Sequence, residues 1–239
     1  MSLLTPGKLF LADQRGVLET AEFRRFSTFQ FGPYVHAHKQ PFGRLLALNE
    51  ETLAGGQTVS LPVTAAGHLL ILPITGAVWA GAGPGPATLV DVAQLGVFTV
   101  AAGSTVHFTN PYGTELISFL HIWLLAPAGA AAAQVFAFDL ESRPNQLVEA
   151  APVLAGPPPG ALPPGPAFGV QMGRFAGRAE TSCALPGGTQ FFAFVLAGAF
   201  EVAGRLLHAG DGLALWDTLA VDLEALSPDA VVITLTLAA

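Results

Sequence analysis

Two histidines that lie two residues apart are the first candidates for chemistry in this chain. His36 and His38 occur in the segment YVHAHKQPFG, and on a β-strand their spacing would turn both imidazoles to one face. Imidazoles bind transition metals, but two of them without a third ligand form a weak site. Whether the pair forms a site depends on the part of the fold in which this segment lies.

The other reactive side chains form no recognisable catalytic arrangement. Cys183 is the single cysteine, which excludes an internal disulfide and suits a reducing compartment. No group that would lower its pKa is evident nearby, so we expect a small buried residue rather than a reactive thiol. Asp217, Asp222 and Glu224 resemble paired carboxylates, but nothing polar completes a mechanism, and we expect a solvated face or turn. The sequence has no GxSxG, phosphate-loop or CxxC motif.

The composition favours a folded protein with a surface poor in charge. Hydrophobic residues make up 51% of the 239 residues, charged residues make up 11%, and the net charge is −7. Ten Lys and Arg leave no basic patch for phosphates, which argues against nucleic-acid binding by direct charge contact. Such a surface is compatible with a protein partner or with self-association, so an oligomer is possible.

No targeting or membrane segment is evident. The first residues, MSLLTPGKLFLADQRG, lack a basic region followed by an apolar one, so we expect a cytoplasmic protein. Two uncharged stretches, Leu69 to Val90 and Leu116 to Phe138, are long enough to raise the question of a membrane span, but proline and glycine interrupt both. We therefore expect apolar strands joined by turns and no membrane association.

Short runs rich in β-forming residues, ending at Gly, Pro or Asn, predict an all-β fold. The spacing indicates only one short helix, at Ala130 to Asp139. A segment rich in Pro and Gly, residues 152–169, predicts a connector. We therefore expect an N-terminal barrel with an N-terminal extension at residues 1–140, a connector at 141–168 and a C-terminal barrel at 169–239.

The two halves of the chain repeat one pattern. HLLILPITGAVWAG (68–81) resembles QFFAFVLAGAFEVAG (190–204), since each has an apolar strand, a Gly-Ala step and a second strand. A repeat of this length indicates two copies of one supersecondary plan. Two similar antiparallel barrels in tandem are the simplest architecture that satisfies it.

Three segments resemble the pirin family in order, spacing and residue type: RGVLETAEFRRFSTFQFGPY, FGRLLALNEETLAGG and TELISFLHIWLLAP. The glycine turn at Gly76 fits the same pattern, and the resemblance covers the first half well and the second half loosely. Pirins are bicupins, so the resemblance implies two tandem cupin barrels of the jelly-roll type. It also implies an iron or other transition metal in the N-terminal barrel, bound by a His-x-His pair and a later His-x-Glu pair. Some bacterial relatives oxidise quercetin with dioxygen, and others act in regulation through protein partners.

The first pair of implied ligands is absent from this sequence. Counted back from Gly76 in the family's spacing, the His-x-His pair falls at Pro62 and Thr64, and His68 takes the place of a motif glutamate. Of the two replacements, only the Thr64 hydroxyl can bind a transition metal, and it does so weakly.

The second pair of implied ligands is absent as well. Counted from Asn110 and the TELISFLHIWLL segment, the His-x-Glu pair falls at Val106 and Phe108. A register slip of one residue would bring His107 into play, but it would also turn Val106 and Phe108 away from the core. These departures from the family's pattern predict a degenerate site, with no metal and no other cofactor.

The resemblance also places the remaining histidines. The YVHAHKQPFG segment precedes the FGRLLAL strand, whereas the family's metal pair follows it, so we expect His36 and His38 at the surface or a strand edge, with a displaced metal pair as the alternative. His121 alternates with Phe119 and Trp123, so it should face the interior or an interdomain seam and be satisfied by a hydrogen bond. His208 precedes the AGDG turn and should be exposed.

Two functional hypotheses follow. In the favoured one, the N-terminal barrel has an apolar pocket that binds a small apolar ligand or a protein partner without catalysis. Its lining is expected at the family's ligand positions, namely Pro62, Thr64, His68, Val106 and Phe108. The alternative is a metal-dependent, quercetinase-like dioxygenase with a site rebuilt from other histidines, namely His68, His107, His36 and His38.

Overall fold

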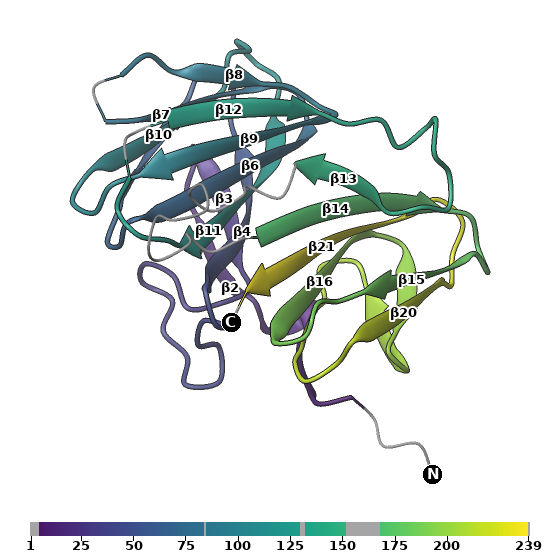
Figure 1. Cartoon of the computed structure of the whole chain (residues 1–239). Coiled ribbons are helices and arrows are strands. Elements are labelled where there is room, and N and C mark those ends of the chain that lie inside the picture. The colour runs from purple at the N-terminus through teal and green to yellow at the C-terminus, as the bar shows by residue number, and fades with distance from the viewer. Residues whose placement is uncertain (1–4, 84, 130–131, 152–167, 239) are drawn as a thin grey trace. The chain divides into compact units, whose positions relative to one another are not determined.

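The computed structural model describes residues 5–83, 85–129, 132–151 and 168–238, and these form an almost purely β structure (Figure 1). Apart from one short 3-10 helix, η1 (Ala12–Gln14), every regular element in the described ranges is a strand. The predicted all-β fold is therefore confirmed. No helix within these ranges is long and apolar enough to cross a membrane.

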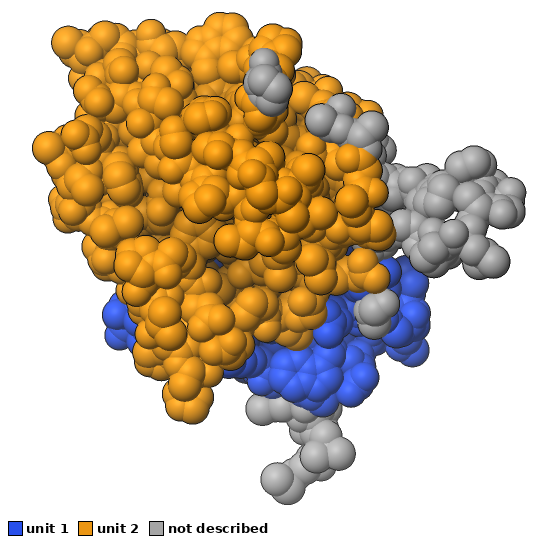
Figure 2. Space-filling view, turned by 90° about the vertical axis from the view of Figure 1, so that its left-hand side faces the viewer, with its two compact units in different colours: residues 1–14, 138–239 blue, residues 15–137 orange. Residues whose placement is uncertain are grey.

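The chain divides into two compact units, which are coloured separately in Figure 2. One comprises residues 15–137 and is called the first barrel; the other comprises residues 1–14 and 138–239 and is called the second barrel. Each consists of two antiparallel sheets whose inner faces share one apolar core, as in a jelly roll.

The first barrel combines a seven-stranded and a four-stranded sheet. In spatial order the larger sheet contains β12 (Ala132–Ala137), β9 (Gln94–Val100), β6 (Gly67–Thr75), β11 (Ile117–Leu125), β4 (Leu45–Leu53), β3 (Phe23–Ser27) and β2 (Gly16–Glu19). The smaller sheet contains β5 (Thr58–Pro62), β10 (Thr105–Thr109), β7 (Val78–Ala82) and β8 (Thr88–Val90).

The second barrel combines a six-stranded and a four-stranded sheet. In spatial order the larger sheet contains β1 (Gly7–Phe10), β19 (Gly212–Leu215), β16 (Thr189–Ala197), β21 (Ala230–Ala238), β14 (Phe168–Phe175) and β13 (Val148–Ala151). The smaller sheet contains β15 (Glu180–Ala184), β20 (Ala220–Ala225), β17 (Ala199–Val202) and β18 (Arg205–His208).

The start of the chain belongs to the second barrel, whereas residues 1–140 were predicted to form one unit. β1 pairs antiparallel with β19, and the Phe10 ring is buried beside Phe192 at a centroid distance of 5.9 Å. The buried Asp211 side chain accepts hydrogen bonds from the backbone of Ala12 (2.7 Å) and His208 (2.8 Å). Strand pairing, aromatic packing and this carboxylate together hold residues 7–14, and none of the three is visible in local sequence.

Two further segments differ from the prediction. The prediction of a short helix at residues 130–139 is wrong, because β12 pairs with β9 along its whole length. The ladder hydrogen bonds and the β-forming residues Val135 and Phe136 outweigh the helix propensity of alanine. The predicted connector at 141–168 contains β13, which pairs with β14. The Pro- and Gly-rich residues 152–167 lie outside the described residues.

The repeated sequence pattern corresponds to a repeated structural unit. β6, Gly76 and β7 in the first barrel match β16, Gly198 and β17 in the second. Both glycines have a positive φ, 69° and 74°, at the turn between the two strands. A Cβ at Gly76 would also lie 2.7 Å from the Ile117 side chain, so both backbone conformation and packing select glycine there.

We predict that Gly76→Ala lowers the free energy of unfolding by about 1–3 kcal/mol, because alanine is strained at positive φ. Gly113→Ala is a matched control in the same barrel, since its φ is not in the left-handed region and a Cβ there meets nothing within 4 Å. Urea denaturation of both variants measures the difference. Equal losses in the two variants would contradict the role assigned to Gly76.

Candidate functional site

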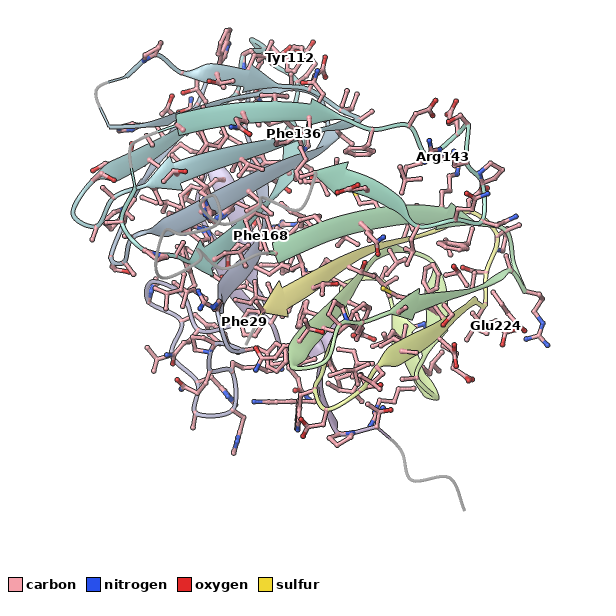
Figure 3. The ribbon with its side chains drawn as sticks, in the orientation of Figure 1. Phe29, Tyr112, Phe136, Arg143, Phe168 and Glu224 are labelled. Carbon is pink, nitrogen blue, oxygen red and sulfur yellow. The ribbon has the colours of Figure 1, made fainter. Side chains whose placement is uncertain are left out.

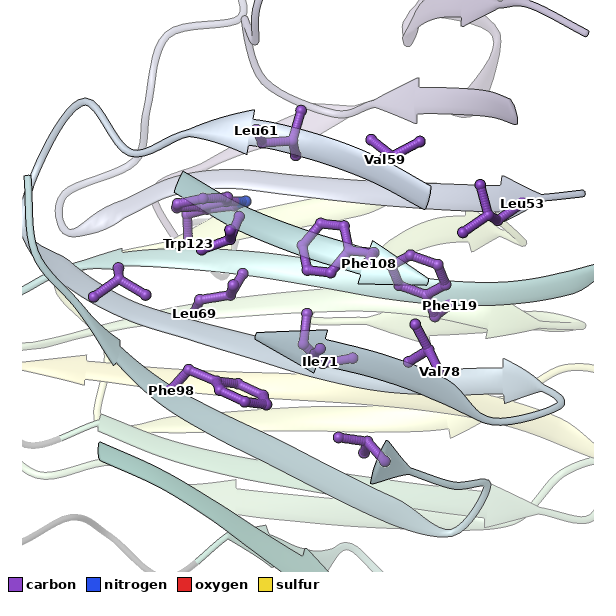
Figure 4. Packing of buried hydrophobic residues seen from close by; sticks show 14 of the residues in the cluster. Leu53, Val59, Leu61, Leu69, Ile71, Val78, Phe98, Phe108, Phe119 and Trp123 are labelled. Atoms are coloured by element: carbon purple, nitrogen blue, oxygen red, sulfur yellow. The ribbon is translucent and has the colours of Figure 1, made fainter. Parts of the chain in front are cut away.

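Two of the predicted site residues belong to the core of the first barrel. Val106 and Phe108 lie on β10, directly opposite Leu61 and Val59 of β5, and both are fully buried. The Phe108 ring packs edge-on against Phe119 at a centroid distance of 5.3 Å (Figure 4). These two positions, where the resemblance implies a histidine and a glutamate, therefore face the barrel interior and carry only hydrocarbon.

Pro62 and Thr64 do not face that interior. Val59, Leu61 and Val63 are buried in the core, whereas Pro62 and Thr64 alternate with them and are exposed. The interior positions beside β10 are therefore those of Leu61 and Val63, one residue away from the predicted pair. Leucine and valine offer no donor atom either, so this one-residue correction supplies no metal ligand.

His68 lies on the face of β6 that points away from the core of the first barrel. It alternates on β6 with Leu69, which points into the core, and its Nδ1 is 3.4 Å from the Thr99 hydroxyl on β9. Partial burial lowers the pKa of His68 below its ordinary value. The structure thus does not bring Pro62, Thr64, His68, Val106 and Phe108 together in one pocket.

The other histidines are also separated. His36 and His38 are exposed in the loop after β3, as expected, with ring centroids 5.8 Å apart, and His36 stacks on Tyr34. His107 points outward from β10, where its Nδ1 is 2.8 Å from the Ser60 hydroxyl. His208 is exposed, as expected. Within the described ranges, no three His, Cys, Asp or Glu side chains lie close enough together to hold a metal.

The carboxylates singled out in the second barrel form a solvated face, as predicted. Asp222 and Glu224 alternate on β20 with Val221 and Leu223, which are buried in the core. Glu224 accepts a hydrogen bond from Arg178 at 2.8 Å, and Asp217 is exposed. Figure 3 labels Glu224 on β20, which lies between β15 and β17 in this sheet.

A buried polar cluster occupies the interior of the first barrel. Arg25 of β3 donates two hydrogen bonds to the Glu51 carboxylate of β4, at 2.6 and 3.2 Å. His121 Nε2 lies 3.1 Å from the same carboxylate, and the Trp123 indole donates to His121 Nδ1 at 2.8 Å. All four side chains are at most 7% exposed.

Strand pairing explains why these residues meet. Arg25 and Glu51 are directly opposite each other on β3 and β4, and Glu51 is opposite Phe119 on β11. His121 is the next inward-facing residue of β11, so it reaches Glu51 diagonally. The alternation of His121 with Phe119 and Trp123 predicted its interior position and its hydrogen bond. Sequence reasoning missed Arg25 and Glu51, although charged residues within apolar strands were a usable signal.

The hydrogen bonds define the protonation of His121. The Trp123 indole can only donate, so His121 Nδ1 must be an acceptor and the proton sits on Nε2, which donates to Glu51. Burial lowers the pKa of His121, an effect partly offset by its hydrogen bond to Glu51. His121 is therefore neutral, and the charge of Glu51 is balanced by Arg25.

A cavity of about 870 Å³ opens beside this cluster at the mouth of the first barrel. Arg25 and Trp123 form part of its wall, and Phe31, in the loop after β3, packs on both of them. Among the residues that the structure describes, Arg25 and Glu22 are its only charged lining residues. Pro62 and Thr64 line the cavity, whereas His68, Val106 and Phe108 do not. The wall is otherwise mainly apolar, with Leu18, Phe23, Leu46 and Leu61 among its members.

The residues present do not fit a transition metal. At the family's ligand positions the inward side chains are hydrocarbon, and the one buried histidine uses both ring nitrogens for Glu51 and Trp123. The Glu51 carboxylate is in turn occupied by Arg25 and His121. Among the described residues of this interior, no group of side chains offers the free donor set that iron, nickel or copper needs.

Comparison with known proteins places this fold. Residues 168–237 match the family model described as the quercetinase C-terminal cupin domain. The crystal structure of YhhW from Escherichia coli is similar, with 19% identity, a TM-score of 0.79 and 97% of each chain covered. The Escherichia coli bacterial pirin YhhW in complex with nickel(II) gives 20% identity and a TM-score of 0.81, with 97% of this chain and 98% of that chain covered.

A third solved structure is quercetin 2,3-dioxygenase from Acinetobacter baumannii, with 15% identity, a TM-score of 0.71 and coverage of 96% of this chain and 85% of that chain. No curated protein matches the chain at a significant level.

The fold is a bicupin, with two cupin barrels in tandem. Its fold is similar to that of the bacterial pirin YhhW, as the resemblance implied.

We predict that Glu51→Gln lowers the free energy of unfolding by about 3–5 kcal/mol, because it leaves Arg25 buried without its counter-charge. Glu19→Gln, which removes an exposed partner of Arg24, should lower the free energy of unfolding far less, because solvent screens that ion pair. Chemical denaturation at neutral pH measures both. If Glu51→Gln lowered the free energy of unfolding no more than Glu19→Gln does, the account of Glu51 as the necessary counter-charge of Arg25 would be contradicted.

We also predict that stability falls as the pH drops below about 6.5, the ordinary pKa of histidine. Because the pKa of His121 is lowered in the folded protein, the unfolded chain binds more protons in this range, so protonation favours unfolding. Thermal unfolding from pH 7.5 to 5.0 should show a steeper fall for the natural sequence than for His121→Gln. His208→Gln, at an exposed position, is the control and should keep the natural slope.

Proposed function

We propose that the first barrel is a degenerate cupin site that carries no metal and acts as a non-catalytic binding module for a small apolar ligand. The observation that carries this proposal is the placement of Val106 and Phe108. Both face the interior at positions where the resemblance implies a histidine and a glutamate, and both are packed into the hydrocarbon core. A metal at this position would have to displace tightly packed side chains and would find no ligand.

The cavity at the barrel mouth supports the binding role. Its volume of about 870 Å³ lies within the range of small-molecule sites, which are concave and mostly apolar with a few polar groups. Phe23, Phe31 and Trp123 supply aromatic surface, and Arg25 supplies a donor at the wall. Because Glu51 already balances Arg25, an anionic ligand would add an uncompensated charge. The site therefore favours an uncharged ligand.

A buried amide next to the cluster gives further support. Asn49 lies directly opposite His121 on β4 and is fully buried, yet neither end of its amide has a hydrogen-bond partner among the described residues. An unpartnered buried amide costs about 1–3 kcal/mol of folding free energy. Such a group is therefore expected where a bound ligand supplies the missing hydrogen bonds. A ligand that displaces Phe31 would approach this row of side chains.

The alternative dioxygenase needs other histidines to converge, and the geometry does not favour it. His68 and Leu69 point to opposite faces of the larger sheet, His107 points outward from the smaller sheet, and His36 and His38 lie in an exposed loop. The alternative to a small ligand is a protein partner bound at the same cavity. The concave shape of the cavity favours a small molecule over a protein surface.

We predict that the uncharged fluorophore N-phenyl-1-naphthylamine binds with saturable, one-to-one stoichiometry. Ala65→Phe should fill the cavity from its rim and weaken binding by about tenfold or more, which corresponds to ~1.4 kcal/mol. Ala133→Phe, at an exposed position of β12 outside the lining, is the matched control and should bind like the natural protein. Fluorescence titration gives all three affinities. Unchanged affinity in Ala65→Phe would contradict the assignment of the cavity.

A further inference from the structure

Arg25 presents unused hydrogen-bond donors to the cavity of the first barrel. Its side chain is 4% exposed and forms part of the cavity wall. A guanidinium group carries its N–H donors in one plane, and the two hydrogen bonds to Glu51 use Nε and Nη2. Nη1 makes no hydrogen bond to any residue that the structure describes. It is not closed off from solvent as the Asn49 amide is, so its N–H groups face open space, which at this residue is the cavity.

The guanidinium group is held in one orientation. Glu51 accepts its two hydrogen bonds at 2.6 and 3.2 Å, and the rings of Phe23 and Phe31 lie against it, with centroids 5.2 and 5.3 Å from Cζ. A donor that is already fixed loses little conformational entropy when a ligand binds. The open N–H groups of Arg25 are therefore preorganised for an acceptor atom in the cavity.

The surrounding charges select an uncharged acceptor. Arg25 is balanced by Glu51, and His121 is neutral, so the cluster offers no net positive charge to an anion. Glu22 adds a second carboxylate to the wall of the cavity. A carboxylate or phosphate ligand would be repelled by both, whereas a carbonyl oxygen offers two lone pairs to N–H donors and brings no charge.

We propose that Arg25 is the specificity-determining residue of this cavity and selects an uncharged carbonyl compound, namely a ketone, ester or amide with an apolar body. The carbonyl oxygen accepts hydrogen bonds from Arg25 Nη1, and the apolar body packs on Leu46, Phe31 and Trp123 of the wall. This inference rests on the proposed function, because it concerns the same cavity, and it adds the chemical group that the ligand must carry.

Three naphthalenes of nearly the same shape provide the test. 2-Acetylnaphthalene carries a ketone, 2-isopropenylnaphthalene has a C=CH₂ group in place of C=O, and 2-naphthoate carries a carboxylate. Each is titrated against full-length protein loaded with N-phenyl-1-naphthylamine, and displacement of the fluorophore gives its dissociation constant. The hydrocarbon is more hydrophobic than the ketone, so the quantity compared between proteins is the ratio of their two dissociation constants.

A double variant removes the donor without leaving a buried charge. Arg25→Met together with Glu51→Gln keeps an amide oxygen that can accept from His121, and it avoids the cost of breaking a buried ion pair on one side only. The ratio should shift about tenfold in favour of the hydrocarbon, because a hydrogen bond from a charged donor is lost. Arg24→Met together with Glu19→Gln makes the same changes in an exposed ion pair and should keep the natural ratio.

The natural protein gives a second readout that needs no variant. The carbonyl group of 2-acetylnaphthalene is labelled with ¹³C, and its stretching band is recorded in the bound state by infrared difference spectroscopy. A hydrogen bond from the guanidinium group weakens the C=O bond. The band of the bound ketone should therefore lie at lower wavenumber than the band of the same ketone in hexane.

The outcomes separate this inference from the proposed function. If neither the fluorophore nor the ketone binds, both are overturned. Three other results would overturn the role of Arg25 and leave the cavity as a binding site: an unchanged ratio in the Arg25→Met, Glu51→Gln protein, a carbonyl band like that in hexane, or tighter binding of 2-naphthoate than of the ketone.

Discussion

The interior of the first barrel depends on one buried carboxylate, Glu51. A carboxylate that is removed from water is stable only with charged and hydrogen-bonding partners, and Arg25 and His121 supply them from the two neighbouring strands. This requirement fixes the neutral form of His121, and the Trp123 indole completes the chain of hydrogen bonds. Val106, Phe108 and Phe119 pack around the cluster, and the buried Asn49 amide lies beside it. The hydrogen bonds of Glu51 and His121 are made to other members of the cluster, so these two residues have a structural role.

The two barrels use the same plan with different interiors. Both contain the strand–glycine–strand unit, and both keep a cavity near the end of the apolar core. The first cavity has aromatic walls and a guanidinium group, whereas the second has a thiol, an amide and hydroxyl groups. The likeness to YhhW and to quercetin 2,3-dioxygenase lies in the arrangement of the strands, and fold alone does not determine chemistry. Function therefore has to be argued from these particular side chains.

Much of the fold was predictable from sequence because it follows from local pattern. The apolar runs ending at Gly, Pro or Asn gave the strands, and the repeated Gly-Ala step gave two barrels. The partners of β1 and β13 were not predictable, because each pairs with a strand that only the tertiary fold brings near. The facing of Pro62 and Thr64 was missed for another reason: a count along a family motif can err by one residue, and on a strand one residue reverses the face. Charged residues within apolar strands could have singled out Arg25 and Glu51, but their pairing needed cross-strand register, which a single sequence does not contain.

The central claim is that the first barrel holds its interior together without a metal. The most direct measurement is the metal content of tag-free protein, determined by elemental mass spectrometry after growth with iron, manganese, nickel, copper and zinc all supplied. The account predicts that each metal is far below one equivalent per chain in folded protein. Stoichiometric metal that is lost in His68→Ala or His107→Ala would contradict it and would favour the dioxygenase.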